Sequence, residues 1–178
     1  FTGKVAIVTG AGGGIGEGVL GLLERGACLV DLALNVHRVD AEQLLADADR
    51  LQHTVEQVLK AESHALDFMQ ITYSPVDRRA EPLMQMAADR GLGVIVNRPF
   101  DGGALLRRLA REPLPGLARE LECSTWAALV LKWELAFAAV TCVIPATTRT
   151  DHVAQNLAAM HGPLPDTRQR AALTALFE

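Results

Sequence analysis

The 178-residue sequence has few aromatic side chains, and tyrosine is the scarcest of them. Aromatic residues make up 4% of the chain and Tyr73 is its single tyrosine, whereas hydrophobic residues make up 49%. A core must therefore be built mainly from alanine, leucine and valine, a composition that is common in parallel sheets covered by helices. The single tyrosine also limits any mechanism with a tyrosine as proton donor to one position.

Cysteine, positive charge and long apolar runs are scarce as well. The three cysteines, at positions 28, 123 and 142, are far apart and form no CxxC pair, so the sequence predicts neither a disulfide framework nor a zinc site. A net charge of −4 gives no basic field for nucleic acid. No apolar run reaches the length of a membrane span and no signal peptide is recognisable. We expect a cytoplasmic protein that binds neither metal, nucleic acid nor membrane.

Short apolar runs alternate with stretches of helical period along the chain. Strands followed by helices are expected at residues 5–9, 27–34, 66–73, 93–97 and 141–144. Repeated βα units predict an α/β fold, with a five-stranded parallel sheet in a single domain over residues 1–178. We expect an open doubly wound sheet of flavodoxin or Rossmann type, with strand order 2-1-3-4-5. A partial (β/α)8 barrel is the alternative, because five units fall short of the eight that close a barrel.

A glycine-rich loop joins the first expected strand to the helix after it. Residues 9–16 read TGAGGGIG, and residues 3–8 before them read GKVAIV. Glycine lets a pyrophosphate approach the backbone, and the free N–H groups of the following helix face its charge. The stretch resembles the start of a short-chain dehydrogenase/reductase over residues 1–50, although an unliganded βα turn stays an alternative. The cofactor-binding candidates are Thr9, Gly10, Gly12, Gly14, Ile15 and Gly16 in the loop, and Asp31 in the second strand.

This resemblance implies catalytic residues that the sequence does not have. Short-chain dehydrogenases use a tyrosine followed four residues later by a lysine, whereas Tyr73 is followed at that distance by Asp77. Asp31 also lies two residues before the position at which the family holds the ribose. Both NADP and NAD therefore stay open as cofactors.

Three stretches of the second half resemble a different family. They read LDFMQITYSPVDRRAE, AADRGLGVIVNRPFDGGALLRRL and TCVIPATTRTDHVAQNLAA. They are similar to the C-terminal half of an aldo/keto reductase, a resemblance that we assign to residues 66–178. It implies the last three βα units of a (β/α)8 barrel and an NADP site. The positions that match cofactor-binding residues are Gln70, Asn97, Arg98, Pro99, Thr147, Thr148, Arg149, Gln155 and Asn156.

The resemblance implies separate roles for these positions. Gln70 matches a glutamine that binds the nicotinamide carboxamide, whereas Asn97 replaces a tyrosine that stacks on the nicotinamide ring. Arg149 could hold a 2′-phosphate, because a guanidinium is a natural bidentate partner of phosphate. The catalytic Asp, Tyr, Lys and His of aldo/keto reductases belong to the first half of the barrel, where this chain resembles a dehydrogenase instead.

Each half thus resembles a cofactor-binding piece without the catalytic residues of its family. We expect a chimeric or engineered α/β protein, derived from NAD(P)-dependent oxidoreductases, that retains binding of a dinucleotide or phosphate; whether it is an enzyme stays open. One alternative is a working NAD(P)H-dependent carbonyl reductase of aldo/keto reductase type. The other is a structural or assembly protein without a ligand, in which strand edges and the apolar helix near residues 126–137 form a homodimer.

Overall fold

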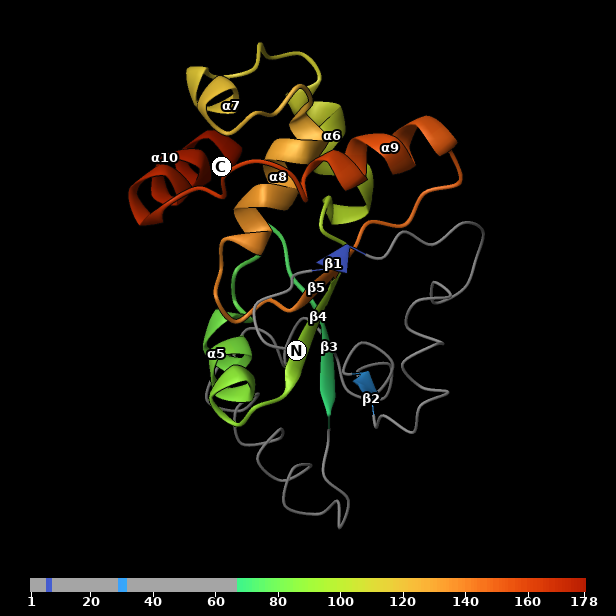
Figure 1. The fold of residues 1–178 in the computed structure, drawn as a ribbon, viewed down its shortest axis with the longest axis vertical. Helices are drawn as coiled ribbons and strands as arrows, with labels where there is room; N and C mark the ends of the chain where they lie inside the picture. Colours follow the sequence, from blue (N-terminus) through green and yellow to red (C-terminus); the bar gives the residue numbers. More distant parts are fainter. Residues whose placement is uncertain (1–5, 8–28, 32–66) are drawn as a thin grey trace.

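The computed structural model describes residues 6–7, 29–31 and 67–178, and these form one parallel sheet with helices. The strands are β1 (Ala6–Ile7), β2 (Leu29–Asp31), β3 (Phe68–Thr72), β4 (Gly93–Asn97) and β5 (Cys142–Ile144). They lie in the order β1-β5-β4-β3-β2, and every neighbouring pair is parallel (Figure 1). The predicted α/β fold with a parallel sheet is confirmed.

The predicted strand order 2-1-3-4-5 is wrong. Strands β2, β3, β4 and β5 are neighbours in the order of the chain, with β1 beyond β5. A right-handed crossover that stays on one face of a sheet adds the next strand beside the previous one, whereas a doubly wound order needs a crossover that changes face. The observed order is therefore compatible with part of a (β/α)8 barrel, the architecture that we gave as the alternative.

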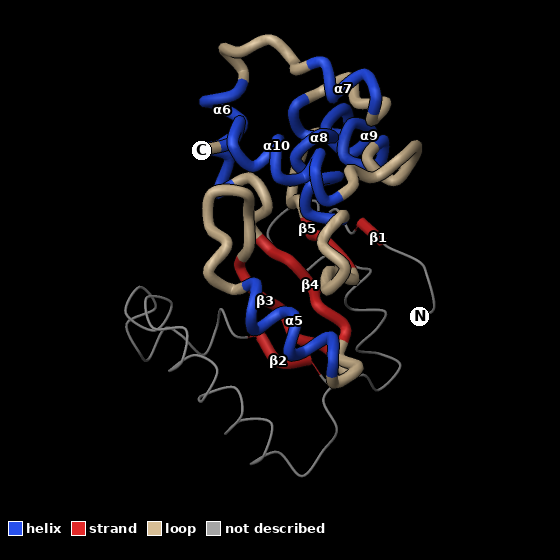
Figure 2. The backbone as a smooth tube through the Cα atoms, turned by 90° about the vertical axis from the view of Figure 1, so that its left-hand side faces the viewer, coloured by secondary structure: helices blue, strands red, loops and turns tan. Residues whose placement is uncertain are grey.

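The helices of the described part lie against one face and one end of the sheet. They are α5 (Glu81–Asp89), the 3₁₀ turn η2 (Asp101–Gly103), α6 (Ala104–Leu109), α7 (Gly116–Glu120), α8 (Trp126–Leu135), α9 (Thr150–Ala158) and α10 (Thr167–Phe177). Helix α5 lies along β3 and β4, and α6 to α10 lie together at one end of the sheet (Figures 1 and 2).

The two faces of the sheet carry different cores. Alternate residues of β3, β4 and β5, such as Met69, Val94 and Val143, belong to a large apolar cluster that includes the helices. The residues between them, Phe68 and Ile95 among others, form a separate small cluster. Side chains alternate between the two faces along a strand. The face with the small cluster therefore also carries Gln70, together with the side chains two residues before and after it in β3. We call it the inner face.

Helix α8 is the centre of the large cluster, as its apolar sequence predicts. All its residues from Ala128 to Leu135 are buried. The helix is capped by Thr125, whose hydroxyl accepts a hydrogen bond from the Ala128 N–H at 3.2 Å. The helix ends at Leu135, two residues before the end of the apolar helix expected near residues 126–137.

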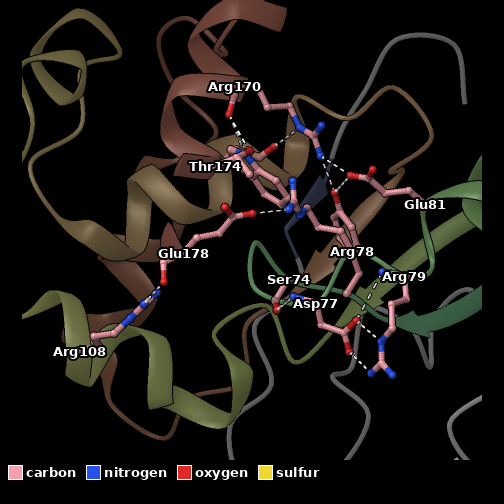
Figure 3. Close-up of polar contacts among 11 residues, drawn as sticks. Ser74, Asp77, Arg78, Arg79, Glu81, Arg108, Arg170, Thr174 and Glu178 are labelled. Atoms are coloured by element: carbon pink, nitrogen blue, oxygen red, sulfur yellow. Dashed lines mark hydrogen bonds and ion pairs between the residues drawn. The ribbon is translucent and has the colours of Figure 1, made fainter. Parts of the chain in front are cut away.

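Helix α10 is fastened to the rest of the core by Arg170. The guanidinium lies 4.2 Å from the centre of the Trp133 ring and 2.8 Å from Glu81 Oε1, and Figure 3 shows Arg170 and Glu81 pointing toward each other. The Trp133 indole N–H donates to the Arg170 carbonyl oxygen at 3.1 Å. Helices α5, α8 and α10 are therefore joined at one point by charge, ring stacking and hydrogen bonds.

Candidate functional site

Six of the nine predicted site residues of the second half lie at or just beyond the carboxyl ends of β4 and β5, whereas Gln70 lies within β3, and Gln155 and Asn156 lie within α9. Strands β3, β4 and β5 are parallel, so the loops that follow Thr72, Asn97 and Ile144 meet at the same edge of the sheet. Ligands of parallel α/β sheets bind at this edge. Two loops carry five of the candidates: residues 98–103 after β4 and residues 145–149 after β5.

Two of the candidates, Gln70 and Asn97, are brought to the inner face. Gln70 is 6% exposed and lies opposite Ile95, whereas Asn97 is half-buried and lies opposite Thr72. The Thr72 hydroxyl donates to Asn97 Oδ1 over 2.7 Å. Thr72 was not among the predicted residues, although the two-residue period from Gln70 could have indicated it.

In the loop after β4, Arg98 is exposed to solvent and Pro99 is buried. Because it is buried, Pro99 shapes the loop. Arg98 has a left-handed φ of 54°, and Gly102 follows with a φ of 58°. A Cβ on Gly102 would lie 3.3 Å from Arg98 Nη2, so the guanidinium rests close to the glycine backbone. The loop thus places one cationic side chain at the edge of the sheet.

The loop after β5 leads into α9 and contains the second cation, Arg149. The Arg149 N–H donates to Thr147 Oγ1 at 3.2 Å, which orders the turn before the helix. The guanidinium donates to both carboxylate oxygens of Asp151, at 3.1 Å and 2.6 Å. These bonds from Arg149 lower the pKa of Asp151 to about 2. Without a ligand, the predicted phosphate-binding arginine is therefore engaged by an exposed carboxylate.

The remaining candidates on this side differ in exposure. Asn156 is 3% exposed, and its Nδ2 donates to the Pro145 carbonyl oxygen at 3.5 Å. This contact ties α9 to the loop that precedes it. Thr148 is exposed and Gln155 is half-buried. The structure thus gathers Thr147, Thr148 and Arg149 at the start of α9, with Asn156 as an internal support.

The N-terminal candidates are not covered by the structure. Thr9, Gly10, Gly12, Gly14, Ile15 and Gly16 lie outside the described residues. The backbone of Asp31 is described, and its register in β2 sets it opposite Gln70. The glycine loop therefore stays a prediction.

The single tyrosine faces the helices, on the side opposite to Gln70. Tyr73 is fully buried and stacks on Trp133 with ring centres 5.6 Å apart. Its hydroxyl donates to Glu81 Oε1 at 2.6 Å and accepts from Arg170. Burial, followed by the hydrogen bond to Glu81, strongly raises the pKa of Tyr73. Tyr73 is therefore a packing residue and is not placed to protonate a substrate.

No group of three or more His, Cys, Asp or Glu side chains in residues 6–7, 29–31 and 67–178 is arranged to hold a metal ion. Within those ranges no helix is long and apolar enough to cross a bilayer.

Solved structures of aldo-keto reductases are similar to this chain in fold. The thermostable aldo-keto reductase Tm1743, in complex with the inhibitor epalrestat, aligns with a TM-score of 0.54 and 19% identity over 68% of this chain and 43% of that protein. The holo form of AKR11C1 from Bacillus halodurans aligns with a TM-score of 0.52 and 24% identity over 69% and 46%. Its apo form gives 0.53 and 25% over 69% and 47%. The chain spans less than half the length of these reductases, and no curated protein sequence matches it.

The sequence pattern of the Aldo/keto reductase family matches residues 45–176. The match begins about twenty residues before the predicted start at residue 66. It leaves out residues 1–44, where the resemblance to short-chain dehydrogenases stays a prediction. Since the match covers well over half of the sequence, and its strands and helices align with solved reductases of this type, the chain belongs to the aldo/keto reductase family.

Proposed function

We propose that this chain binds NADP(H) and supplies the cofactor-binding part of an NAD(P)H-dependent carbonyl reductase. The observation that carries the proposal is the loop before α9. Thr147, Thr148 and Arg149 lie directly before this helix, next to the backbone N–H groups of its first turn. Two threonine hydroxyls, a guanidinium and the start of a helix together form a suitable site for a phosphate. Such a loop favours NADP(H) over NAD(H), because only the former carries a 2′-phosphate.

The pairing of Arg149 with Asp151 sets how the phosphate would be bound. Both side chains are more than half exposed, at 65% and 53%, and ion pairs so exposed are weak. A phosphate can therefore displace Asp151 from the guanidinium at little cost. The carboxylate remains nearby and repels the phosphate, so Asp151 should weaken binding.

The inner face would hold the other end of the dinucleotide. Gln70 and Asn97 are the amide side chains on that face of β3 and β4, and amides can donate to and accept from a ring carboxamide. The bound cofactor would supply the hydride for carbonyl reduction. The residues described here would bind and orient the cofactor; the proton donor must come from elsewhere, because Tyr73 is buried beneath the helices.

The chimeric origin is a separate proposal, supported by the contrast between the glycine loop of residues 9–16 and the family match, which starts at residue 45. It would add a second phosphate-binding loop to the one before α9. The variant Gly14→Asp tests this addition: it should weaken NADPH binding if the glycine loop contributes, and leave it unchanged if only the loop before α9 does.

Titration with NADPH and NADH, followed by ligand fluorescence, tests the proposed function. We expect saturable NADPH binding that is tighter than NADH binding. Arg149→Glu should weaken NADPH binding at least tenfold, while Arg111→Glu, the same charge change at another exposed arginine, should leave it unchanged. Asp151→Asn should tighten NADPH binding roughly twofold to fivefold, since an exposed ion pair is lost. A folded protein that binds neither dinucleotide would contradict the proposal.

A further inference from the structure

The amide of Asn97 is held in one orientation before any ligand arrives. Its Oδ1 accepts from the Thr72 hydroxyl at 2.7 Å, across the directly opposed pair of β3 and β4. Its backbone is paired in register with Thr72 on one side and Ile144 on the other. An asparagine anchored in this way has its oxygen engaged and its nitrogen directed elsewhere.

Within the described part of the chain, the nitrogen is therefore the unpaired end of this amide. Among the described residues, Asn97 Nδ2 has no hydrogen-bond partner, and the side chain is only half-buried. It lies on the inner face, above a small apolar cluster of Phe68, Ile95 and Cys142 with Ile144 packed against it, and Gln70 lies beside this cluster, opposite Ile95. An oriented N–H donor above an apolar floor suits a flat ring that carries a carbonyl group.

We propose that Thr72 is a positioning residue that aims Asn97 Nδ2 at the carbonyl oxygen of the nicotinamide carboxamide. This inference rests on the proposed binding of NADP(H) and adds how the ring is recognised. Asn97 would thus select the ring by donating a hydrogen bond, and the Thr72 hydroxyl, by donating to Oδ1, would leave Nδ2 directed at the ligand. Loss of one neutral hydrogen bond of this kind weakens binding about threefold to tenfold.

The variant Asn97→Asp removes the donor and keeps the shape. The carboxylate still accepts from Thr72, but it has no N–H to offer the ligand. NADPH can adapt, because its carboxamide can rotate and present its own NH₂ to the carboxylate. The 3-acetylpyridine analogue of NADPH has a carbonyl and no NH₂, so it cannot adapt. We expect Asn97→Asp to weaken binding of the analogue about threefold to tenfold and binding of NADPH less than threefold.

The variant Thr72→Val tests the positioning role. Without the hydroxyl, the amide can turn either its oxygen or its nitrogen to the ligand. The analogue should therefore again lose more affinity than NADPH does. The difference between the two losses should be smaller than in Asn97→Asp. Thr141→Val is the matched control. Its hydroxyl accepts from the Val94 N–H at 3.0 Å, near the other end of the same sheet, so its loss should leave the ratio of the two affinities unchanged.

Adenosine 2′,5′-bisphosphate, which has no nicotinamide ring, separates this inference from the proposed function. It should bind wild type, Asn97→Asp and Thr72→Val equally, and it should lose affinity in Arg149→Glu. If Asn97→Asp and Thr72→Val leave the ratio of the analogue to NADPH at its wild-type value, the inference is wrong and the proposed function stands. If wild type binds neither NADPH nor the bisphosphate, both are wrong.

Discussion

Replacement of Glu134 by leucine should stabilise the protein, and more so as the pH rises. Glu134 is fully buried on α8, and neither of its carboxyl oxygens has a hydrogen-bond partner in the described part of the chain. A buried polar group without a partner costs about 1 to 3 kcal/mol. Leucine fills a similar volume without this cost, so we expect Glu134→Leu to raise the free energy of unfolding by about that amount where the carboxyl is protonated.

The pH dependence follows from the pKa of Glu134. Burial raises that pKa well above its ordinary value of 4.5, and the charge of Arg170 offsets part of the rise. The folded protein therefore keeps a proton that the unfolded chain has released, and stability falls as the pH rises above about 4.5 toward the folded pKa. Each pH unit in this window costs up to about 1.4 kcal/mol.

Urea denaturation at several pH values between 5 and 8 measures this effect through tryptophan fluorescence. The stability difference between Glu134→Leu and wild type should widen as the pH rises, and Glu134→Gln should remove the pH dependence without removing the buried polar group. Glu112→Gln, at an exposed glutamate, is the control and should run parallel to wild type. Equal differences at pH 5 and pH 8 would refute the reasoning.

Three further substitutions and one control, each measured by urea denaturation, test the contacts of the described core. Tyr73→Phe should cost about 1 to 3 kcal/mol, because the hydroxyl bonded to two partners is removed, and a loss of NADPH affinity would contradict its structural role. Thr125→Ala should cost about 1 kcal/mol through loss of the α8 cap; an unchanged stability would mean that another group replaces the cap. Gly93→Ala should cost about 1 to 3 kcal/mol, because the added Cβ would lie 2.5 Å from the Phe68 ring. Gly116→Ala, where a Cβ meets nothing within 4 Å, should be neutral or stabilising by about 0.5 kcal/mol, and a similar loss in both glycine variants would exclude the clash.

The sequence predicted the elements of the second half better than their arrangement. The strand at residues 93–97 was predicted with the bounds observed. Strand order was predicted wrongly. Hydrophobic period shows that a strand has a buried face, but does not show on which face the next helix will pack.

The sequence predicted where the candidate site residues lie, but it did not predict their hydrogen-bond partners. The resemblance named Arg149 and Asn97, and the structure places both at the carboxyl edge of the sheet. The resemblance did not indicate that Arg149 donates hydrogen bonds to Asp151, or that Thr72 donates one to the side-chain amide of Asn97. The Arg149–Asp151 bond depends on local geometry within a turn and the Thr72–Asn97 bond on strand register, and neither is encoded in the spacing of a motif.

The bond between Arg170 and Tyr73 joins residues 97 positions apart. Contacts of such wide separation form late, because a long loop must close before they are gained. The ribosome makes the three strands β3, β4 and β5 and residue Trp133 before it makes α10. Until α10 is made, the Trp133 ring lacks the helix that covers it in the folded protein. Newly made chains should therefore expose an aromatic surface for an interval, and in that interval aggregation and chaperone binding compete with folding.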